Sequence, residues 1–258
     1  GKVEAVVHGH VTAEVAAQSV REITRALGAR PAPESELLRP RYLRVQPGEE
    51  IVDAGPIEGV NSVFAREVLL PDDSPLTRAT ALVLTSFISN PFFTELRTNQ
   101  QLGYIVAARS VTLHRNRHLL FEIQSSVYPP DELRRRIDAY VPTLPAALAA
   151  VSPEKWSALV AGARANIEAK PKSIAARAQR FHLYAFTQNE DWDQRQALLN
   201  ALTSLTQEQA VAALQRLVTP ATSSRRTVIL WSREHRLTEE IKPTFSDRDA
   251  WKGTRTYD

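Results

Sequence analysis

The sequence predicts an α+β protein in which helices pack on one face of a single sheet. Three observations lead to this prediction. Short runs rich in β-branched residues recur up to residue 127, helical periodicity fills most of residues 130–220, and a final apolar run at 227–231 returns to strand. With 258 residues, the chain is long enough to bury about three quarters of its unfolded surface in a core.

Seven segments have the composition of strands. They are residues 2–8, 43–45, 51–54, 62–70, 104–112, 118–127 and 227–231. The five residues between the fifth and sixth segments suit a hairpin loop. In the sixth segment Leu119, Phe121 and Ile123 alternate with a set of residues that is largely polar. This alternation predicts an antiparallel sheet with one covered face.

Helix-start residues precede the helical segments. Side chains that commonly cap a helix N-terminus stand at Thr12, Ser74, Ser152, Ser173 and Thr206. Thr206 is followed three positions later by Gln209, which is the signature of a capping box. Pro142 and Pro145 interrupt the segment 131–150, so we expect a kink or a break in that helix.

The most informative part of the chain is a short helix that ends at a glycine and turns directly into a strand. Asn90 suits the position that caps this helix, and Pro91 suits its first turn. Gly103 suits the left-handed residue just past a helix end. We therefore expect Arg97, near the end of the helix, and Tyr104, at the start of the strand, to place two hydrogen-bond donors at one sharp corner.

Composition excludes several classes of function. The chain has 32 basic and 29 acidic residues, and this near balance argues against nucleic-acid binding. It has no cysteine, so disulfides and thiolate metal sites are excluded. No apolar run approaches the length of a membrane span. Because the chain starts with Gly1 and lacks methionine, we expect it to begin inside a longer sequence or after processing.

The corner resembles a known peptidase family. Its sequence, Leu-Arg-Thr-x-x-Gln-Leu-Gly-Tyr-x-Val at residues 96–106, closely resembles the corner in the C-terminal half of the pitrilysin and insulin-degrading-enzyme (insulysin) family of zinc metallopeptidases. Residues 3–12 look like the strand, glycine turn and helix start of that family's last, non-zinc domain. Lys-Pro-Lys-Ser at 170–173 resembles its turn between late helices. The resemblance spans residues 3–232.

This resemblance implies a fold and a division of the chain. The implied fold is the mitochondrial-processing-peptidase-like metallohydrolase fold, with a mixed, mostly antiparallel sheet of five to six strands. The implied domains are an inactive, non-zinc peptidase domain at 1–232 and an extended C-terminal tail at 233–258. The implied partner is a zinc-bearing N-terminal half, on the same polypeptide or on a separate subunit, and the implied substrates are peptides.

The family's zinc motif, His-x-x-Glu-His, is absent from the sequence. The histidines are His8, His10, His114, His118, His182 and His235. His114 and His118 have the right interval, but Arg117 stands where the glutamate is needed and the pair lies in a predicted loop. His8 and His10 could share one face of a strand, although a polar strand end is the simpler interpretation. The resemblance thus implies zinc in the intact enzyme, and we expect none bound by this chain.

Two interpretations of Arg97 and Tyr104 follow. From the residue types alone, Arg97 pairs with an acid or caps its helix, and Tyr104 is an ordinary strand aromatic. The resemblance implies instead that both side chains reach the scissile bond and hold a substrate carbonyl or an oxyanion. We expect no hydrolysis by this chain alone.

The function implied by the resemblance is that of a C-terminal domain that completes the substrate chamber of a zinc endopeptidase. The alternative is a catalytically inactive peptide-binding or scaffold subunit of the same fold. The alanine- and arginine-rich composition hints at a bacterial origin, and periplasm and cytoplasm are both compatible with the sequence.

Overall fold

The computed structural model describes residues 3–30, 32–36, 41–113, 116–187 and 191–257. The chain forms two compact units. The smaller unit comprises Gly1–Tyr42 and Ala169–Asp193, and the larger unit comprises Leu43–Glu168 and Gln194–Asp258.

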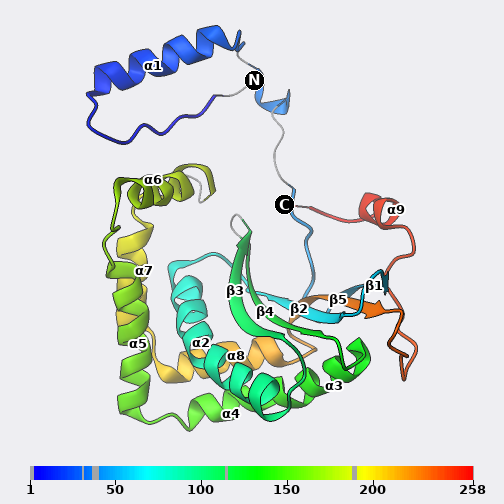
Figure 1. The fold of residues 1–258 in the computed structure, drawn as a ribbon. Coiled ribbons are helices and arrows are strands. Elements are labelled where there is room, and N and C mark those ends of the chain that lie inside the picture. Colours follow the sequence, from blue (N-terminus) through cyan, green and yellow to red (C-terminus); the bar gives the residue numbers. More distant parts are fainter. Residues whose placement is uncertain (1–2, 31, 37–40, 114–115, 188–190, 258) are drawn as a thin grey trace. The chain divides into compact units, whose positions relative to one another are not determined.

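The larger unit contains a five-stranded sheet in the order β1-β5-β2-β4-β3 (Figure 1). Its strands are β1 (Glu50–Ile57), β2 (Ser62–Leu69), β3 (Ile105–Leu113), β4 (Asn116–Ser125) and β5 (Ser224–Ser232). β1 and β5 are parallel, and the other pairs are antiparallel. The predicted α+β class and the mixed, mostly antiparallel sheet of five to six strands are therefore confirmed.

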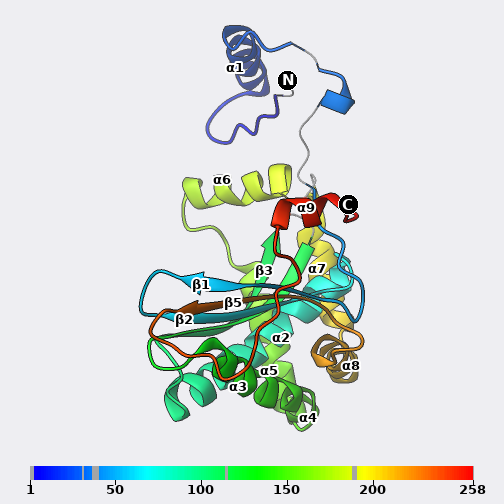
Figure 2. The same cartoon turned by 90° about the vertical axis from the view of Figure 1, so that its right-hand side faces the viewer.

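The helices that pack on the sheet cover one of its faces (Figure 2). Burial alternates along β2, where Phe64, Arg66 and Val68 are buried and the residues between them are half-buried. Phe121 and Ile123 of β4 continue the covered face. They join the core with Leu84 and other residues of the helices. The opposite face of β2 is therefore more open, as expected for an antiparallel sheet with one covered face, whereas His118 and Leu120 on that face of β4 are buried.

The helices of the larger unit include those predicted to start after Ser74, Ser152 and Thr206, together with a short helix, Arg248–Gly253, in the segment that was expected to be an extended tail. They are α2 (Pro75–Phe93), α3 (Pro130–Tyr140), α4 (Leu144–Ala149), α5 (Pro153–Glu168), α7 (Gln194–Ser204), α8 (Gln207–Val218) and α9 (Arg248–Gly253). The expected break falls at a 3₁₀ turn, Val141–Thr143, which separates α3 from α4. Thr206 and Gln209 form the predicted capping box at the start of α8.

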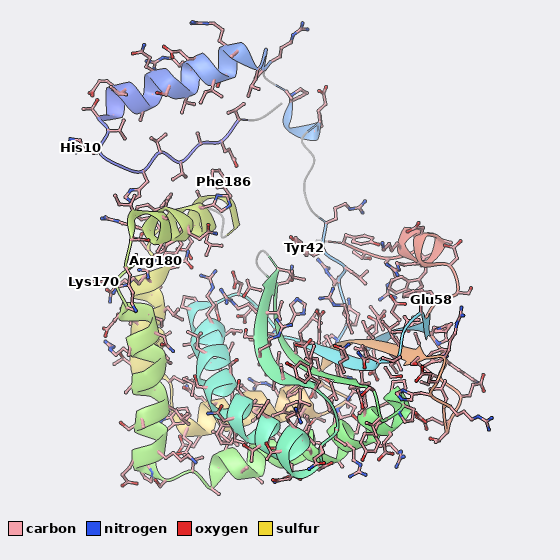
Figure 3. All side chains as sticks on the ribbon, in the orientation of Figure 1. His10, Tyr42, Glu58, Lys170, Arg180 and Phe186 are labelled. Carbon is pink, nitrogen blue, oxygen red and sulfur yellow. The ribbon has the colours of Figure 1, made fainter. Side chains whose placement is uncertain are left out.

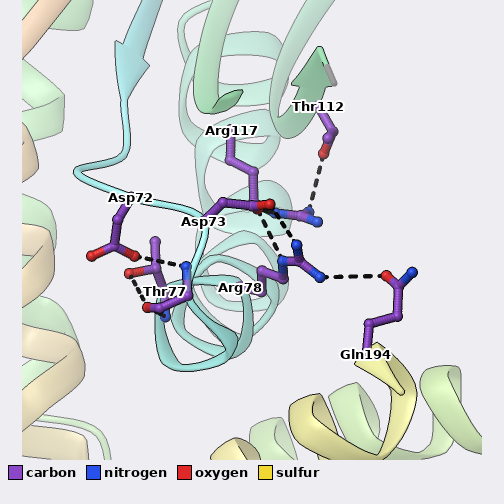
Figure 4. Close-up of polar contacts among 8 residues, drawn as sticks. Asp72, Asp73, Thr77, Arg78, Thr112, Arg117 and Gln194 are labelled. Atoms are coloured by element: carbon purple, nitrogen blue, oxygen red, sulfur yellow. Dashed lines mark hydrogen bonds and ion pairs between the residues drawn. The ribbon is translucent and has the colours of Figure 1, made fainter. Parts of the chain in front are cut away.

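A cluster of polar residues fixes the start of α2 (Figure 4). Ser74 caps the helix by accepting from the backbone of Thr77, and Asp72 accepts from the backbone N–H of Ser74. Helix capping thus accounts for Asp72. The neighbouring Asp73 has a different role, because its carboxylate accepts from the guanidinium of Arg78 and from that of Arg117.

The smaller unit corrects one prediction. Residues 3–8, expected to be part of a strand at 2–8, form no strand in the structure. A strand needs a hydrogen-bonded neighbour, and none of the described residues pairs with this segment. The unit includes α1 (Ala13–Ala26), capped by Thr12 as predicted, a 3₁₀ turn at Glu34–Glu36, and α6 (Ile174–His182), which continues into the π-helix Leu183–Thr187.

The predicted Lys-Pro turn precedes α6. Ser173 caps that helix, and Arg180 of α6 donates to the carbonyl of Ala169 beside Lys170 (Figure 3). This bond ties the start of the turn to the helix that follows it.

The segment after Ser232 contacts the larger unit. Thr244 exchanges two hydrogen bonds with Val52 of β1, and the backbone of Thr238 donates to the carboxylate of Asp131. Leu43 and Tyr257 form one isolated bridge, so the strand expected at 43–45 is reduced to a single pair. The domain limits 1–232 and 233–258 stay a prediction.

Candidate functional site

The helix that leads to the corner is longer than predicted. α2 passes through Pro91 and is followed at once by a π-helix, η2 (Thr94–Asn99). Asn90 therefore does not cap a new helix. Proline lacks an N–H, but the N–H of Thr94 bonds to the carbonyls of Asn90 and Pro91 and carries the helix onward. The full burial of Phe92 and Leu96 holds this continuous run against the core.

The reversal of the chain occurs two residues before the predicted position. Gln101, with φ of 54°, is the left-handed residue, whereas Gly103 does not have a positive φ. Gly103 is required for another reason. A Cβ atom added there would lie 2.1 Å from the backbone oxygen of Gln124, so only glycine lets the turn pack against β4.

The turn is held on both sides of this reversal. The N–H of Gln100 donates to the carbonyl of Glu95 at 3.0 Å, and the N–H of Leu102 donates to that of Leu96 at 3.0 Å. Leu96 and Leu102 are both fully buried. Arg97 follows Leu96 directly, and Gly103 follows Leu102. The two buried leucines therefore hold both sides of the corner against the core.

Arg97 and Tyr104 meet at this corner. The guanidinium carbon of Arg97 lies 5.9 Å from the centroid of the Tyr104 ring, within the range of a cation–π contact. Tyr104 is 86% exposed and Arg97 is half-buried. The structure therefore brings the two predicted site residues together and presents the tyrosine ring to solvent rather than to the core. Their role in substrate binding stays a prediction.

The nearest acid of the helix is engaged elsewhere. Glu95 accepts from the side-chain amides of Gln100 and Asn99, each at 2.8 Å, and these two hydrogen bonds lower the pKa of Glu95. Within the described residues, no hydrogen bond or ion pair is formed by the guanidinium of Arg97. Its N–H donors are therefore available to a ligand.

The corner opens onto an edge of the sheet. β3 begins directly after Tyr104, and within the described chain it pairs only with β4. Ile105 is 42% exposed beside the tyrosine. An edge strand offers unpaired backbone groups to an extended peptide. The site therefore combines two side-chain donors with a strand edge.

The described residues do not fit a metal ion. They contain no group of three or more histidine, cysteine, aspartate or glutamate side chains that could hold one. His114 lies outside the described residues. Its predicted companion His118 is 1% exposed, and burial together with the charge of Arg226 lowers its pKa to about 4. The ring of His8 packs edge-on against Phe181 at 5.0 Å.

No helix in the described part of the chain has the length and apolarity needed to cross a lipid bilayer.

This chain is similar to several proteins of one class. A family model described as "PQQ synthase PqqF-like, C-terminal lobe domain 4" matches residues 83–182, which include the whole corner. Protease 3 of Escherichia coli K12 is 25% identical over 205 residues, covering 79% of this chain and 21% of its own length. Mouse insulin-degrading enzyme is 24% identical over 222 residues, which cover 84% of this chain and 22% of the mouse protein.

Solved structures show the same fold. Pitrilysin superposes with a TM-score of 0.84 at 20% identity, over 97% of this chain and 27% of that one. A peptidase M16 inactive domain from Pseudomonas fluorescens superposes with a TM-score of 0.60 at 13% identity, over 90% of this chain and 53% of that one.

These likenesses define the class first: the chain has the fold of the inactive, C-terminal domains of M16 peptidases. It is a homologue of the pitrilysin and insulin-degrading-enzyme peptidases, as the sequence of the corner indicates. The chain spans about a fifth of the length of these curated relatives.

Sequence reasoning missed three features of the site. The π-helix η2 has no residue signature of its own, and Gln101 was not distinguished from Gly103 as the left-handed residue. Glutamine is uncommon at positive φ, so local preference favoured the glycine. The close approach of Gly103 to Gln124 depends on a contact between distant parts of the chain, which no local pattern reveals.

Proposed function

We propose that this chain forms part of the substrate chamber of a zinc-dependent endopeptidase. Arg97 and Tyr104 assist cleavage there by holding the carbonyl or oxyanion of the scissile bond. The observation that carries the proposal is the corner, in which the guanidinium carbon of Arg97 lies 5.9 Å from the centroid of the exposed Tyr104 ring. The homology to named peptidases supports the reaction class.

The chemistry that these residues supply is hydrogen bonding to developing negative charge. The guanidinium of Arg97 remains charged and donates through a planar fork, and the hydroxyl of Tyr104 donates one O–H. A fixed donor at an oxyanion typically contributes ~3 kcal/mol to lowering the barrier. Because the described residues do not fit zinc, we place the metal in another part of the longer protein or on a second subunit, and no step uses a metal held by this chain.

The edge of β3 supplies the other half of the site. An extended peptide that pairs with this strand beyond Tyr104 would run past the corner with its backbone fixed. Pairing of this kind recognises any peptide backbone, so specificity would come from side-chain contacts.

A second candidate function is a catalytically inactive subunit that binds peptides or acts as a scaffold. One of the structures that share the fold is itself described as an inactive domain, which favours this candidate. The two functions differ in one respect: only the first requires the corner to touch the reacting bond.

Reconstitution separates the two candidates. The chain is mixed with the zinc-bearing half of the same longer protein, and cleavage of a quenched fluorescent peptide is followed. Restored cleavage supports the endopeptidase function, whereas peptide binding without cleavage supports the inactive subunit. A parallel sample carries Arg97→Gln and Tyr104→Phe together. Equal cleavage by that sample would contradict the role of the corner.

A further inference from the structure

A chain of five alternating charges lies on the helix-covered face of the larger unit's sheet. Glu50 of β1 lies between two arginines, with one oxygen 3.3 Å from Arg66 Nη2 and the other 3.3 Å from Arg225 Nη1. Arg66 also pairs with Asp138 of α3, and Arg134 Nε lies 3.5 Å from the same carboxylate. The order is therefore arginine, glutamate, arginine, aspartate, arginine.

Both ends of this charge chain are arginines, and this leaves a surplus of one positive charge. Each terminal arginine has one carboxylate neighbour in the chain, whereas the central Arg66 has two. The Nε of Arg225 is buried and has no hydrogen-bond partner among the described residues. A buried donor without an acceptor costs stability, so this end of the chain lacks an anion.

The charges along this chain also shift the pKa values of Arg225 and Glu50. Burial lowers the pKa of Arg225, and the charges of Arg66 and Arg134 add to this effect, whereas the attraction of Glu50 and Asp138 opposes it. Burial raises the pKa of Glu50, but Arg66, Thr227 and Arg225 outweigh it, and the net pKa is lowered. Arg134 thus acts on Arg225 from the other end of the charge chain.

All five charged residues line one cavity of about 390 Å³. Its remaining lining is largely apolar and includes Val68, Phe121, Ile137, Val141, Leu217 and Val218. The volume falls in the range of small-molecule sites, which is roughly 300–1,000 Å³. Asp138 and Arg134 are the most exposed of the five charged side chains, at 43% and 33%, so they mark the solvent side.

We propose that this cavity binds a small monoanionic carboxylate that carries an apolar group. The carboxylate bridges Arg225 and Arg134 and closes the chain of charges into a ring, while the apolar group packs on the hydrophobic lining. This site is separate from the corner of Arg97 and Tyr104 and does not depend on the proposed peptidase function.

Charge balance selects the carboxylate. A single carboxylate balances the three arginines and two acids that line the cavity, whereas a doubly charged phosphate would leave a surplus of the opposite sign. Guanidinium groups bind carboxylates through paired hydrogen bonds. The apolar lining penalises a purely polar ion because it offers no further donors. The carboxylate is either that of a free hydrophobic acid or that of a peptide C-terminus.

Calorimetric titration of the 258-residue chain near neutral pH tests the proposal. N-acetyl-L-leucine represents a peptide C-terminus, 4-methylpentanoate represents a free acid, and N-acetyl-L-leucinamide is the matched neutral control. We expect at least one of the two acids to bind, and the amide to bind about tenfold or more weakly, because it lacks the charge that pairs with the arginines. Tighter binding of N-acetyl-L-leucine identifies a peptide end as the source, and tighter binding of 4-methylpentanoate identifies a free acid.

Two variants act on different parts of the cavity. Arg134→Gln removes a terminal charge, and Val218→Phe fills apolar space while keeping all five charges; each is expected to weaken acid binding about tenfold or more. Arg109→Gln is the matched control, because Arg109 forms an exposed ion pair with Glu122 outside the cavity. If Arg134→Gln does not fold, the effect of Val218→Phe on acid binding still tests the proposal.

Four results would each overturn the proposal. They are no binding of either acid, equal binding of the amide, binding of inorganic phosphate as tight as that of the acids, and acid binding unchanged by the folded variants.

Discussion

Two arginines on one continuous helical run have opposite environments. Arg78, in the first turn of α2, is 7% exposed and donates to Asp73 and to Gln194 of α7. Arg97, in the π-helix that extends α2, is half-buried and lies over the ring of Tyr104, with no hydrogen bond in the described part of the chain.

The two environments indicate different roles for the two arginines. A guanidinium with as little exposure as that of Arg78 must be paired, so its partners reflect the needs of folding. Arg97 keeps partial contact with water and retains its donors, so its position imposes little cost and leaves it free for a ligand. Replacements at the first end of the helix should therefore affect stability, and replacements at the second end should affect function.

The largest loss of stability is expected from Asp73→Ala. Its carboxylate pairs with Arg78 and Arg117, and its removal leaves two largely buried guanidinium groups without that counter-charge. Breaking a buried pair costs about 3–5 kcal/mol of unfolding free energy. Urea denaturation measures the loss.

Asp72→Ala is the matched control for this variant. Asp72 only supports the helix cap, so we expect a loss of about 1 kcal/mol. Equal losses in the two variants would remove the distinction between pairing and capping.

Acid should destabilise the protein through His118. Its pKa is lowered to about 4 by burial and by Arg226, below the usual 6.5. Between these values the unfolded chain binds a proton that the folded chain does not, so stability falls as pH decreases from 6.5 to 4. The contribution is about 3 kcal/mol when complete.

Unfolding free energies measured at several pH values from 7 to 4 test this linkage. His118→Gln is expected to lose less stability on acidification than the parent chain. Parallel pH profiles would show that His118 does not carry the effect.

Gly103→Ala should be less costly but still destabilising. The new Cβ atom would meet the backbone of Gln124 at 2.1 Å, and overpacking of this kind costs about 1–3 kcal/mol. Gly162→Ala is the control, because Gly162 lies inside α5 with no atom within 4 Å of an added Cβ. Alanine there should stabilise by about 0.5–1 kcal/mol. Thermal unfolding of both variants gives the comparison, and a neutral Gly103→Ala would contradict the close approach.

The corner shows how much of the site could be predicted from the sequence. The motif predicted that Arg97 and Tyr104 would meet, and they do, because Leu96 and Leu102 are apolar positions that the core must bury. The exact reversal, at Gln101, was missed because long-range packing outweighed local preference.

Elements that depend on a distant partner were predicted least well. Residues 3–8 have the composition of a strand but no partner among the described residues, and 43–45 retain one bridge. The charge chain of Glu50, Arg66 and Arg225 joins three strands and was invisible in the sequence for the same reason.

The smallest effects on stability are expected at the corner itself. Arg97→Gln and Tyr104→Phe should each change the unfolding free energy by less than about 0.5 kcal/mol, because neither side chain forms a buried polar contact there. Urea denaturation of each variant provides the measurement. A loss as large as that of Asp73→Ala would assign the corner to folding.

The most direct measurement is the turnover number of the proposed zinc endopeptidase, with its zinc-bearing half present and this chain carrying Tyr104→Phe, assayed on a quenched peptide. Tyr257→Phe is the control, since the hydroxyl of Tyr257 bonds to the carbonyl of Lys252 away from the corner. We predict that kcat falls about tenfold or more for Tyr104→Phe, because the oxyanion loses a donor, and that it is unchanged for Tyr257→Phe. Parental kcat in the Tyr104→Phe enzyme would show that the phenol takes no part in cleavage.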